Sequence, residues 1–100
     1  MPDSAAPDSS PPDRGAVPAL RAHYRLQWEP AQDCHVLLYP EGMIKLNGSA
    51  GEILSCVDGS LTVGQIIETL ADKFPGASGL AEDTLEFLRT AHDRRWLQFN

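Results

Sequence analysis

The sequence predicts a small α+β domain in which β-strands come first and helices follow. Three patterns support this fold class. Apolar and polar side chains alternate around a turn within residues 24–47, capping residues bracket two short helical segments within residues 49–76, and a longer amphipathic segment begins near residue 80. Only about 80 residues carry these patterns, so we expect one domain with a small core.

Residues 1–20 are predicted to form a disordered, proline-rich tail, which leaves residues 21–100 as the folded domain. Residues 1–18 contain five prolines, three aspartates and almost no large apolar side chain. Such a segment has too little apolar surface to offset the entropy lost on ordering.

Three strands are predicted after the tail. Residues 24–29 alternate apolar with polar side chains, as in a strand with one buried face, and Trp28 belongs to the apolar set. Residues 34–39 are apolar on both faces, so both sides of this strand are expected to be covered. A Pro-Glu-Gly turn at residues 40–42 then returns the chain as an antiparallel strand over residues 43–47.

Three helices are predicted to follow. Ser49 with Glu52, and Thr62 with Gln65, have the spacing of capping boxes that open two short helices. The third helix begins near Leu80, with acidic residues in its first turn and basic residues in its last, as the helix dipole favours. The apolar residues after this helix are expected to pack back onto the domain.

The third helix has more apolar surface than a single buried stripe requires. Its apolar face is made of Leu80, Thr84, Leu85, Phe87, Leu88 and Ala91. Surplus apolar surface beside the edge of a short sheet is what strand addition of an extended peptide needs. An alternative stays open, in which the edge is merely guarded against aggregation by the charge of Lys45.

The composition argues against several classes of function. A net charge of -6 has the wrong sign for neutralising nucleic-acid phosphates. No apolar run is long enough to cross a membrane and the N-terminus does not resemble a signal peptide, so a cytoplasmic location is expected. The glycines match no nucleotide-binding motif.

No residue is predicted to be catalytic, to bind a metal ion or to hold a cofactor. Cys34 and His35 are neighbours, but adjacent side chains of a strand point to opposite faces and cannot form a catalytic pair. The cysteines and histidines lack the spacing of a metal site, and Cys34 and Cys56 are expected to be small buried side chains. We therefore expect a binding protein and not an enzyme.

Several segments match one known family at compatible spacing. They are Leu37-Leu38-Tyr39-Pro40-Glu41-Gly42, Leu46-Asn47, Ala50, Ile53-Leu54, Asp58-Gly59, Thr62-Val63, Ile66, Leu70, Phe87-Leu88 and Trp96-Leu97. Together they resemble the PqqD family of pyrroloquinoline quinone (PQQ) biosynthesis proteins over roughly residues 22 to 99. Arg95 departs from the family pattern, which often has glycine there.

The resemblance implies a winged-helix-like domain, with a three-stranded antiparallel sheet followed by three helices. It also implies a peptide chaperone without catalytic groups or cofactor, the recognition element for a ribosomally made peptide. Members of the family bind the leader of the precursor peptide PqqA. They deliver it to PqqE, a radical S-adenosylmethionine enzyme that joins a glutamate to a tyrosine within that peptide.

The resemblance further implies a peptide-binding groove between the third strand and the third helix. Carried onto this sequence, the floor of the groove is Met43, Ile44, Lys45 and Leu46, and its wall is Leu85, Leu88, Arg89 and His92. Lys45 or Arg89 is expected to pair with an acidic residue of the leader.

Three other hypotheses remain open at this point. The first is a winged-helix DNA-binding protein or a general protein-interaction module, although four acidic side chains face three basic ones on the predicted recognition helix. The second is a thiol enzyme that uses Cys34. The third concerns assembly, because an exposed edge strand can pair with a second copy and form a homodimer.

Overall fold

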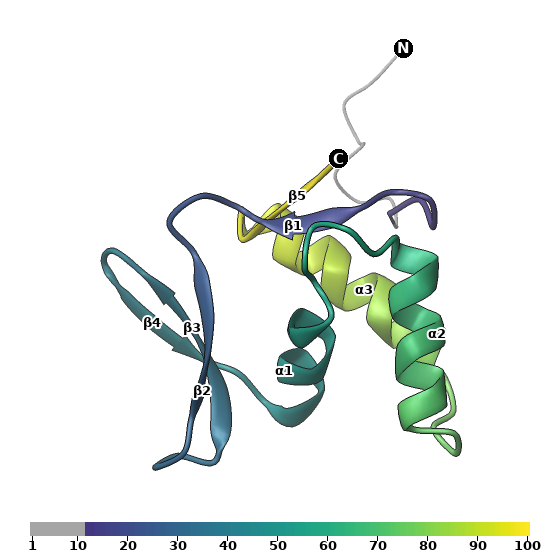
Figure 1. Cartoon of the computed structure of the whole chain (residues 1–100), viewed down its shortest axis with the longest axis horizontal. Helices are drawn as coiled ribbons and strands as arrows, with labels where there is room; N and C mark the ends of the chain where they lie inside the picture. Colours follow the sequence, from purple (N-terminus) through teal and green to yellow (C-terminus); the bar gives the residue numbers. More distant parts are fainter. Residues whose placement is uncertain (1–11) are drawn as a thin grey trace.

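The computed structural model describes residues 12–100, which form three helices and two small antiparallel sheets. The larger sheet has the order β2-β3-β4, and the helices follow it along the chain (Figure 1). The strands of this sheet are β2 (Arg25–Glu29), β3 (Cys34–Tyr39) and β4 (Gly42–Lys45), and the helices are α1 (Gly48–Ser55), α2 (Val63–Lys73) and α3 (Leu80–Asp93). The predicted fold class, three antiparallel strands followed by three helices, is confirmed.

Helix α1 lies between the larger sheet and the pair α2 and α3 (Figure 1). One row of side chains crosses the sheet in register, with Leu26 opposite Leu37 and Leu37 opposite Ile44. Leu37 is completely buried, and its two neighbours pack against the core. The alternation predicted for the strands thus places one apolar face of the sheet against the helices.

Trp28 does not have the buried position that the alternation predicts. Its side chain is 49% exposed, and its ring meets the imidazole of His35 edge to face, with centroids 5.0 Å apart. β2 is an edge strand and α1 packs on the central strand β3, so one side of Trp28 is left open to solvent.

A second sheet joins the two ends of the domain. β1 (Pro18–Leu20) pairs antiparallel with β5 (Leu97–Phe99), so the apolar residues after α3 do pack back onto the domain. The chain before β1 also contacts α2, because the carbonyl oxygens of Ala16 and Arg14 accept hydrogen bonds of 2.9 Å from the amides of Val63 and Gly64. These amides belong to the first turn of α2, which has no partners for them within the helix.

The predicted boundary between tail and domain at residue 20 is therefore wrong. Pro18 is buried, and residues 12–20 supply both strand pairing and helix capping. A strand of three residues is too short to show a periodic pattern, which is why composition alone assigned it to the tail. Residues 1–11 of the predicted tail lie outside the described residues.

The predicted N-cap is correct for α2 and wrong for α1. Thr62 and Gln65 form the predicted capping box of α2, with bonds of 3.1 Å and 2.9 Å. Helix α1 is capped by Asn47, whose Oδ1 accepts from the amide of Ala50 at 2.8 Å, and not by Ser49. Asparagine is as strong an N-cap as serine, and the helix begins two residues earlier than the Ser49 box would place it.

Candidate functional site

The outer edge of β4 is free of any partner strand among residues 12–100. The amide of Leu46 donates to the carbonyl of His35 at 3.1 Å, which makes these two residues a hydrogen-bonded pair of the ladder. Such pairs alternate along an antiparallel ladder, so the N–H and C=O groups of Met43 and Lys45 point away from β3. With respect to residues 12–100, the edge therefore offers two unpaired donors and two unpaired acceptors.

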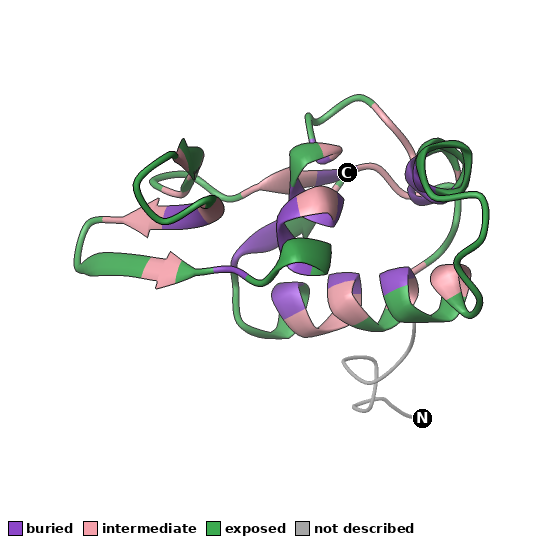
Figure 2. Cartoon of the chain, turned by 90° about the horizontal axis from the view of Figure 1, so that it is seen from below, coloured by how far each residue is buried: buried purple, intermediate pink, exposed green. Residues whose placement is uncertain are grey.

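The four residues predicted as the floor of the groove do lie at this edge. Met43 and Lys45 point to the outer face of the sheet, where Met43 is 57% exposed, and β4 is exposed along most of its length (Figure 2). Ile44 and Leu46 point toward the helices, where Leu46 is buried. A strand added to this edge would place its alternate side chains beside Ile44, facing the helical layer.

The four α3 residues predicted as the wall of the groove do not lie together on one surface. Leu88 is completely buried in the core, and Leu85 packs against that core. His92 turns to the terminal sheet, with its ring 5.1 Å from that of Phe99. Leu85 and Arg89 are each two residues from Phe87, hence about 200° around the helix from it. The structure therefore distributes these four residues between the core and a face of α3 remote from Phe87.

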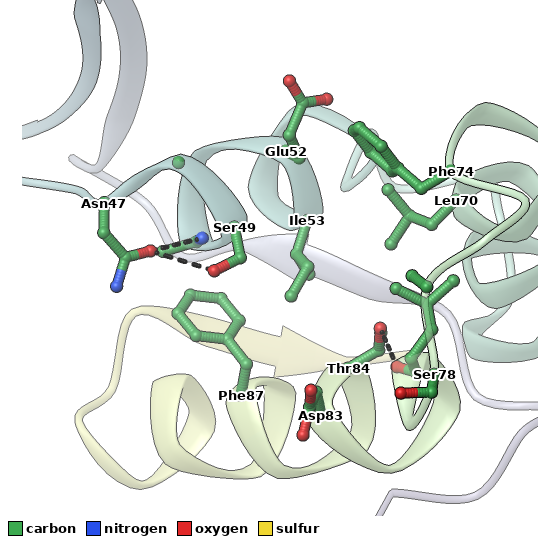
Figure 3. A pocket seen from close by; sticks show the side chains of 14 residues that line it. Asn47, Ser49, Glu52, Ile53, Leu70, Phe74, Ser78, Asp83, Thr84 and Phe87 are labelled. Carbon is green, nitrogen blue, oxygen red and sulfur yellow. Dashed lines mark hydrogen bonds between the residues drawn. The ribbon is translucent and has the colours of Figure 1, made fainter.

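A pocket of about 630 Å³ opens beside the end of β4, between α1, the end of α2 and the first half of α3 (Figure 3). Its larger apolar side chains are Ile53, Leu70, Phe74, Leu80 and Phe87. Asn47, two residues after the end of β4, lies at one side of the pocket. The α3 face that lines this pocket carries Leu80, Asp83, Thr84 and Phe87.

Sequence reasoning missed this pocket. The spacing of Phe74 from Ile67 and Leu70 predicts a side chain on the buried stripe of α2, yet it is 39% exposed and lines the pocket. The available signal was its position directly before Pro75-Gly76, where the helix ends and the side chain is not enclosed by further turns.

The polar rim of the pocket is acidic. Glu52 and Asp83 line it, and no basic side chain does. Lys73 reaches Glu52 from outside the pocket at 2.6 Å, and this hydrogen bond raises the pKa of the Lys73 ammonium group. Asp83 has no ion-pair partner among residues 12–100.

The structure supplies little support for chemistry at the cysteines. Cys34 and Cys56 are half-buried, and burial raises the pKa of the Cys56 thiol, which disfavours the reactive thiolate.

Within residues 12–100, no three histidine, cysteine or acidic side chains gather as metal ligands would. None of the helices in that range is long and apolar enough to cross a bilayer.

Relatives of known name match nearly the whole chain. The family described as coenzyme PQQ synthesis protein D (PqqD) matches residues 34–97. The PqqA binding protein of Pseudomonas aeruginosa (strain UCBPP-PA14) is 55% identical over 87 residues, which are 87% of this chain and 95% of that protein. The PqqA binding protein of Azotobacter vinelandii is 52% identical over 84 residues, covering 84% of this chain and 91% of the relative.

Two solved structures share the fold. The solution NMR structure of the PqqD truncation of Methylobacterium extorquens PqqCD, described as a functional, stand-alone recognition element, has a TM-score of 0.68 at 32% identity and covers 82% of this chain and 88% of that one. The crystal structure of PqqD from Xanthomonas campestris has a TM-score of 0.52 at 35% identity and covers 95% and 99%. The strand order, the helices and the matched segments together show that this chain belongs to the PqqD family.

Proposed function

We propose that this chain is a peptide chaperone of PQQ biosynthesis that binds the precursor peptide PqqA and presents it to the radical S-adenosylmethionine enzyme PqqE. The observation that carries the proposal is the free edge of β4, where the backbone groups of Met43 and Lys45 have no partner strand in the part of the chain that the structure describes. The names of the relatives, PqqA binding proteins and a peptide recognition element, support PqqA as the ligand.

Strand addition suits a carrier that must hold a peptide without reacting with it. Each backbone hydrogen bond contributes about 0.5–1.5 kcal/mol net, so the four groups at this edge hold a short segment reversibly. The side chains of the bound peptide that lie beside Ile44 add selectivity, because they face the helical layer while the neighbouring side chains of the peptide face solvent. Capture through a few residues leaves the rest of the peptide accessible to the modifying enzyme.

The exposed ammonium group of Lys45 lies on the solvent side of the edge. An acidic residue of the leader that pairs with it would increase the association rate and its dependence on salt more than the final affinity. Met43 to Leu46 thus remain the proposed strand half of the site. For the helical half, the proposal replaces the predicted wall with the α3 face that carries Phe87.

Titration of the ¹⁵N-labelled chain with synthetic PqqA tests this proposal. We expect amide shifts concentrated at Met43 to Asn47, because new hydrogen bonds form there. Absence of shifts at near-millimolar peptide would contradict peptide capture, provided that sedimentation shows a monomer at the same concentration. A homodimer formed through the same edge would compete with the peptide, and sedimentation with and without PqqA reveals this competition. Presentation requires in addition that the chain increase the rate at which PqqE modifies PqqA.

A further inference from the structure

We propose that the pocket between α1, α2 and α3 receives an aromatic side chain of the bound peptide, with a cationic side chain next to it in the peptide sequence. This inference rests on the proposed peptide-binding function. It assigns to the pocket a second recognition step, separate from strand pairing at β4, that selects side chains by shape and charge.

The walls of the pocket favour a ring. Phe74 and Phe87 stand on either side of Ile53, and Leu70 lies beneath Phe74 (Figure 3). Phe74 is not among the side chains that pack against the core, and its ring is 39% exposed. The ammonium group of Lys73 lies 5.8 Å from the ring centroid, and the rest of the ring faces the pocket. Aromatic pairs contribute more than their buried area alone, and a volume of about 630 Å³ lies in the range of ligand pockets.

The rim selects the charge of the neighbouring group. Lys73 already neutralises Glu52, whereas the exposed Asp83 has no ion-pair partner among the residues that the structure describes. A cationic group at the mouth gains a partner in Asp83, whereas an anionic group would be repelled by the unpaired carboxylate of Asp83. The pocket therefore discriminates against a peptide whose aromatic residue has acidic neighbours.

The pocket is continuous with the strand edge. Asn47 and Gly48 line it, and only Leu46 separates Asn47 from the last residue of β4, Lys45. An extended peptide advances about 3.3 Å per residue. A peptide paired with β4 thus comes level with the pocket within a few residues, so one leader can occupy both places.

Two variants with matched controls test the pocket by titration with PqqA. Phe74→Ala removes one wall of the pocket. Its control, Trp28→Ala, removes a comparably exposed aromatic side chain from β2, which forms the opposite edge of the sheet from β4. Phe74→Ala should weaken PqqA binding about five- to tenfold, as loss of an aromatic anchor does, and Trp28→Ala less than about twofold.

Charge reversal tests the rim. Asp83→Lys should weaken binding about three- to tenfold at low salt and less at high salt, because a rim charge acts through a screened field. Glu82→Lys makes the same change in charge on the neighbouring residue, which does not line the pocket, and should have a smaller effect. Equal effects of the two reversals would show a general charge effect and overturn the assignment to Asp83.

Failure of this inference can be told from failure of the proposed function. If amide shifts appear at Met43 and Lys45 but Phe74→Ala binds PqqA normally, the strand site stands and the pocket assignment is wrong. If PqqA does not bind at all, the pocket is tested alone with 2-phenylethylamine and 3-phenylpropionate, which carry the same ring with opposite charges. The amine should shift the methyl signals of Ile53, Leu70 and Leu80 at lower concentration than the acid, and equal or absent shifts overturn the proposal.

Discussion

Gly51 of α1 lies directly against the imidazole of His35 on β3. A Cβ built on Gly51 would be 2.7 Å from Nδ1 of His35, closer than a Cβ atom approaches another side chain, and 3.1 Å from the Cβ of His35, which is a tight contact. The absence of a side chain at residue 51 thus lets α1 approach the sheet. This contact sets the position of α1, and therefore of Asn47 and the pocket, relative to the edge of β4.

Gly51→Ala should destabilise the domain by about 1–3 kcal/mol, because the new methyl group displaces His35 or moves α1. Gly48→Ala is the matched control in the same helix. A Cβ there would meet no atom of another element within 4 Å, so alanine should be neutral or stabilise by up to about 1 kcal/mol. Urea unfolding of both variants checks the pair, and equal stabilities would show that the contact with His35 imposes no restriction.

Asn47→Ala should lower the free energy of unfolding by about 1 kcal/mol, since α1 loses its N-cap. The Oδ1 of Asn47 accepts from the amide of Ala50 at 2.8 Å and from the hydroxyl of Ser49 at 3.3 Å. Ser49→Ala removes only the second, exposed bond and should change the stability by less than about 0.5 kcal/mol. Thermal unfolding of both variants checks this order. A larger loss of stability in Ser49→Ala than in Asn47→Ala would show that Ser49 is the N-cap.

Arg95→Gly should stabilise the domain by about 1 kcal/mol. Arg95 adopts a φ of 66°, in the left-handed region that glycine occupies without steric cost. Its neighbour Arg94, with a φ of -83°, is the control, and Arg94→Gly should destabilise the domain. A loss of stability in Arg95→Gly would mean that contacts of the arginine side chain outweigh the backbone strain.

Met43→Pro should abolish most PqqA binding without unfolding the sheet. The amide of Met43 points away from β3, so proline removes a donor from the free edge and leaves the β3–β4 ladder intact. Met43→Ala shortens the side chain but keeps the amide, and should retain most of the affinity. Isothermal titration with PqqA measures both, and equal binding by the two variants would exclude strand addition at this residue.

The stability of the domain should decrease in acid partly through Asp58. Hydrogen bonds from the amides of Ser60 at 2.9 Å and Leu61 at 3.0 Å hold the pKa of the Asp58 carboxyl below its ordinary value of 3.8. The folded state therefore favours the carboxylate, and this contribution is present above pH 3.8 and is lost as the pH falls through the lower, folded-state pKa.

Asp58→Asn should accordingly show a shallower decrease of unfolding free energy between about pH 4.5 and pH 2.5 than the unsubstituted chain. Asp72→Asn serves as the control, because Asp72 is an exposed helical residue outside this turn. Parallel pH profiles of the Asp58→Asn variant and the unsubstituted chain would show that the turn does not contribute to acid sensitivity.

Local information in the sequence determined most of the secondary structure. Cys34–Tyr39 is the strand that its β-forming and apolar residues predict, the Thr62 box opens α2, and α3 begins at Leu80 as predicted. Each of these elements depends on contacts among residues a few positions apart, which are readable from spacing alone. The sequence also predicts a short sheet with an exposed edge, and the strand order β2-β3-β4 places β4 at one edge among residues 12–100.

Only the tertiary structure decided the terminal sheet and the pocket, because both depend on contacts between residues distant in the chain. Pro18–Leu20 becomes a strand because Leu97–Phe99 lies beside it, and neither segment has a pattern of its own. The pocket exists because α1, the end of α2 and α3 meet, and their packing buries Leu88 and leaves Phe74 beside open space. Periodicity shows that a helix has apolar faces, but the elements packed against it determine which face a ligand can reach.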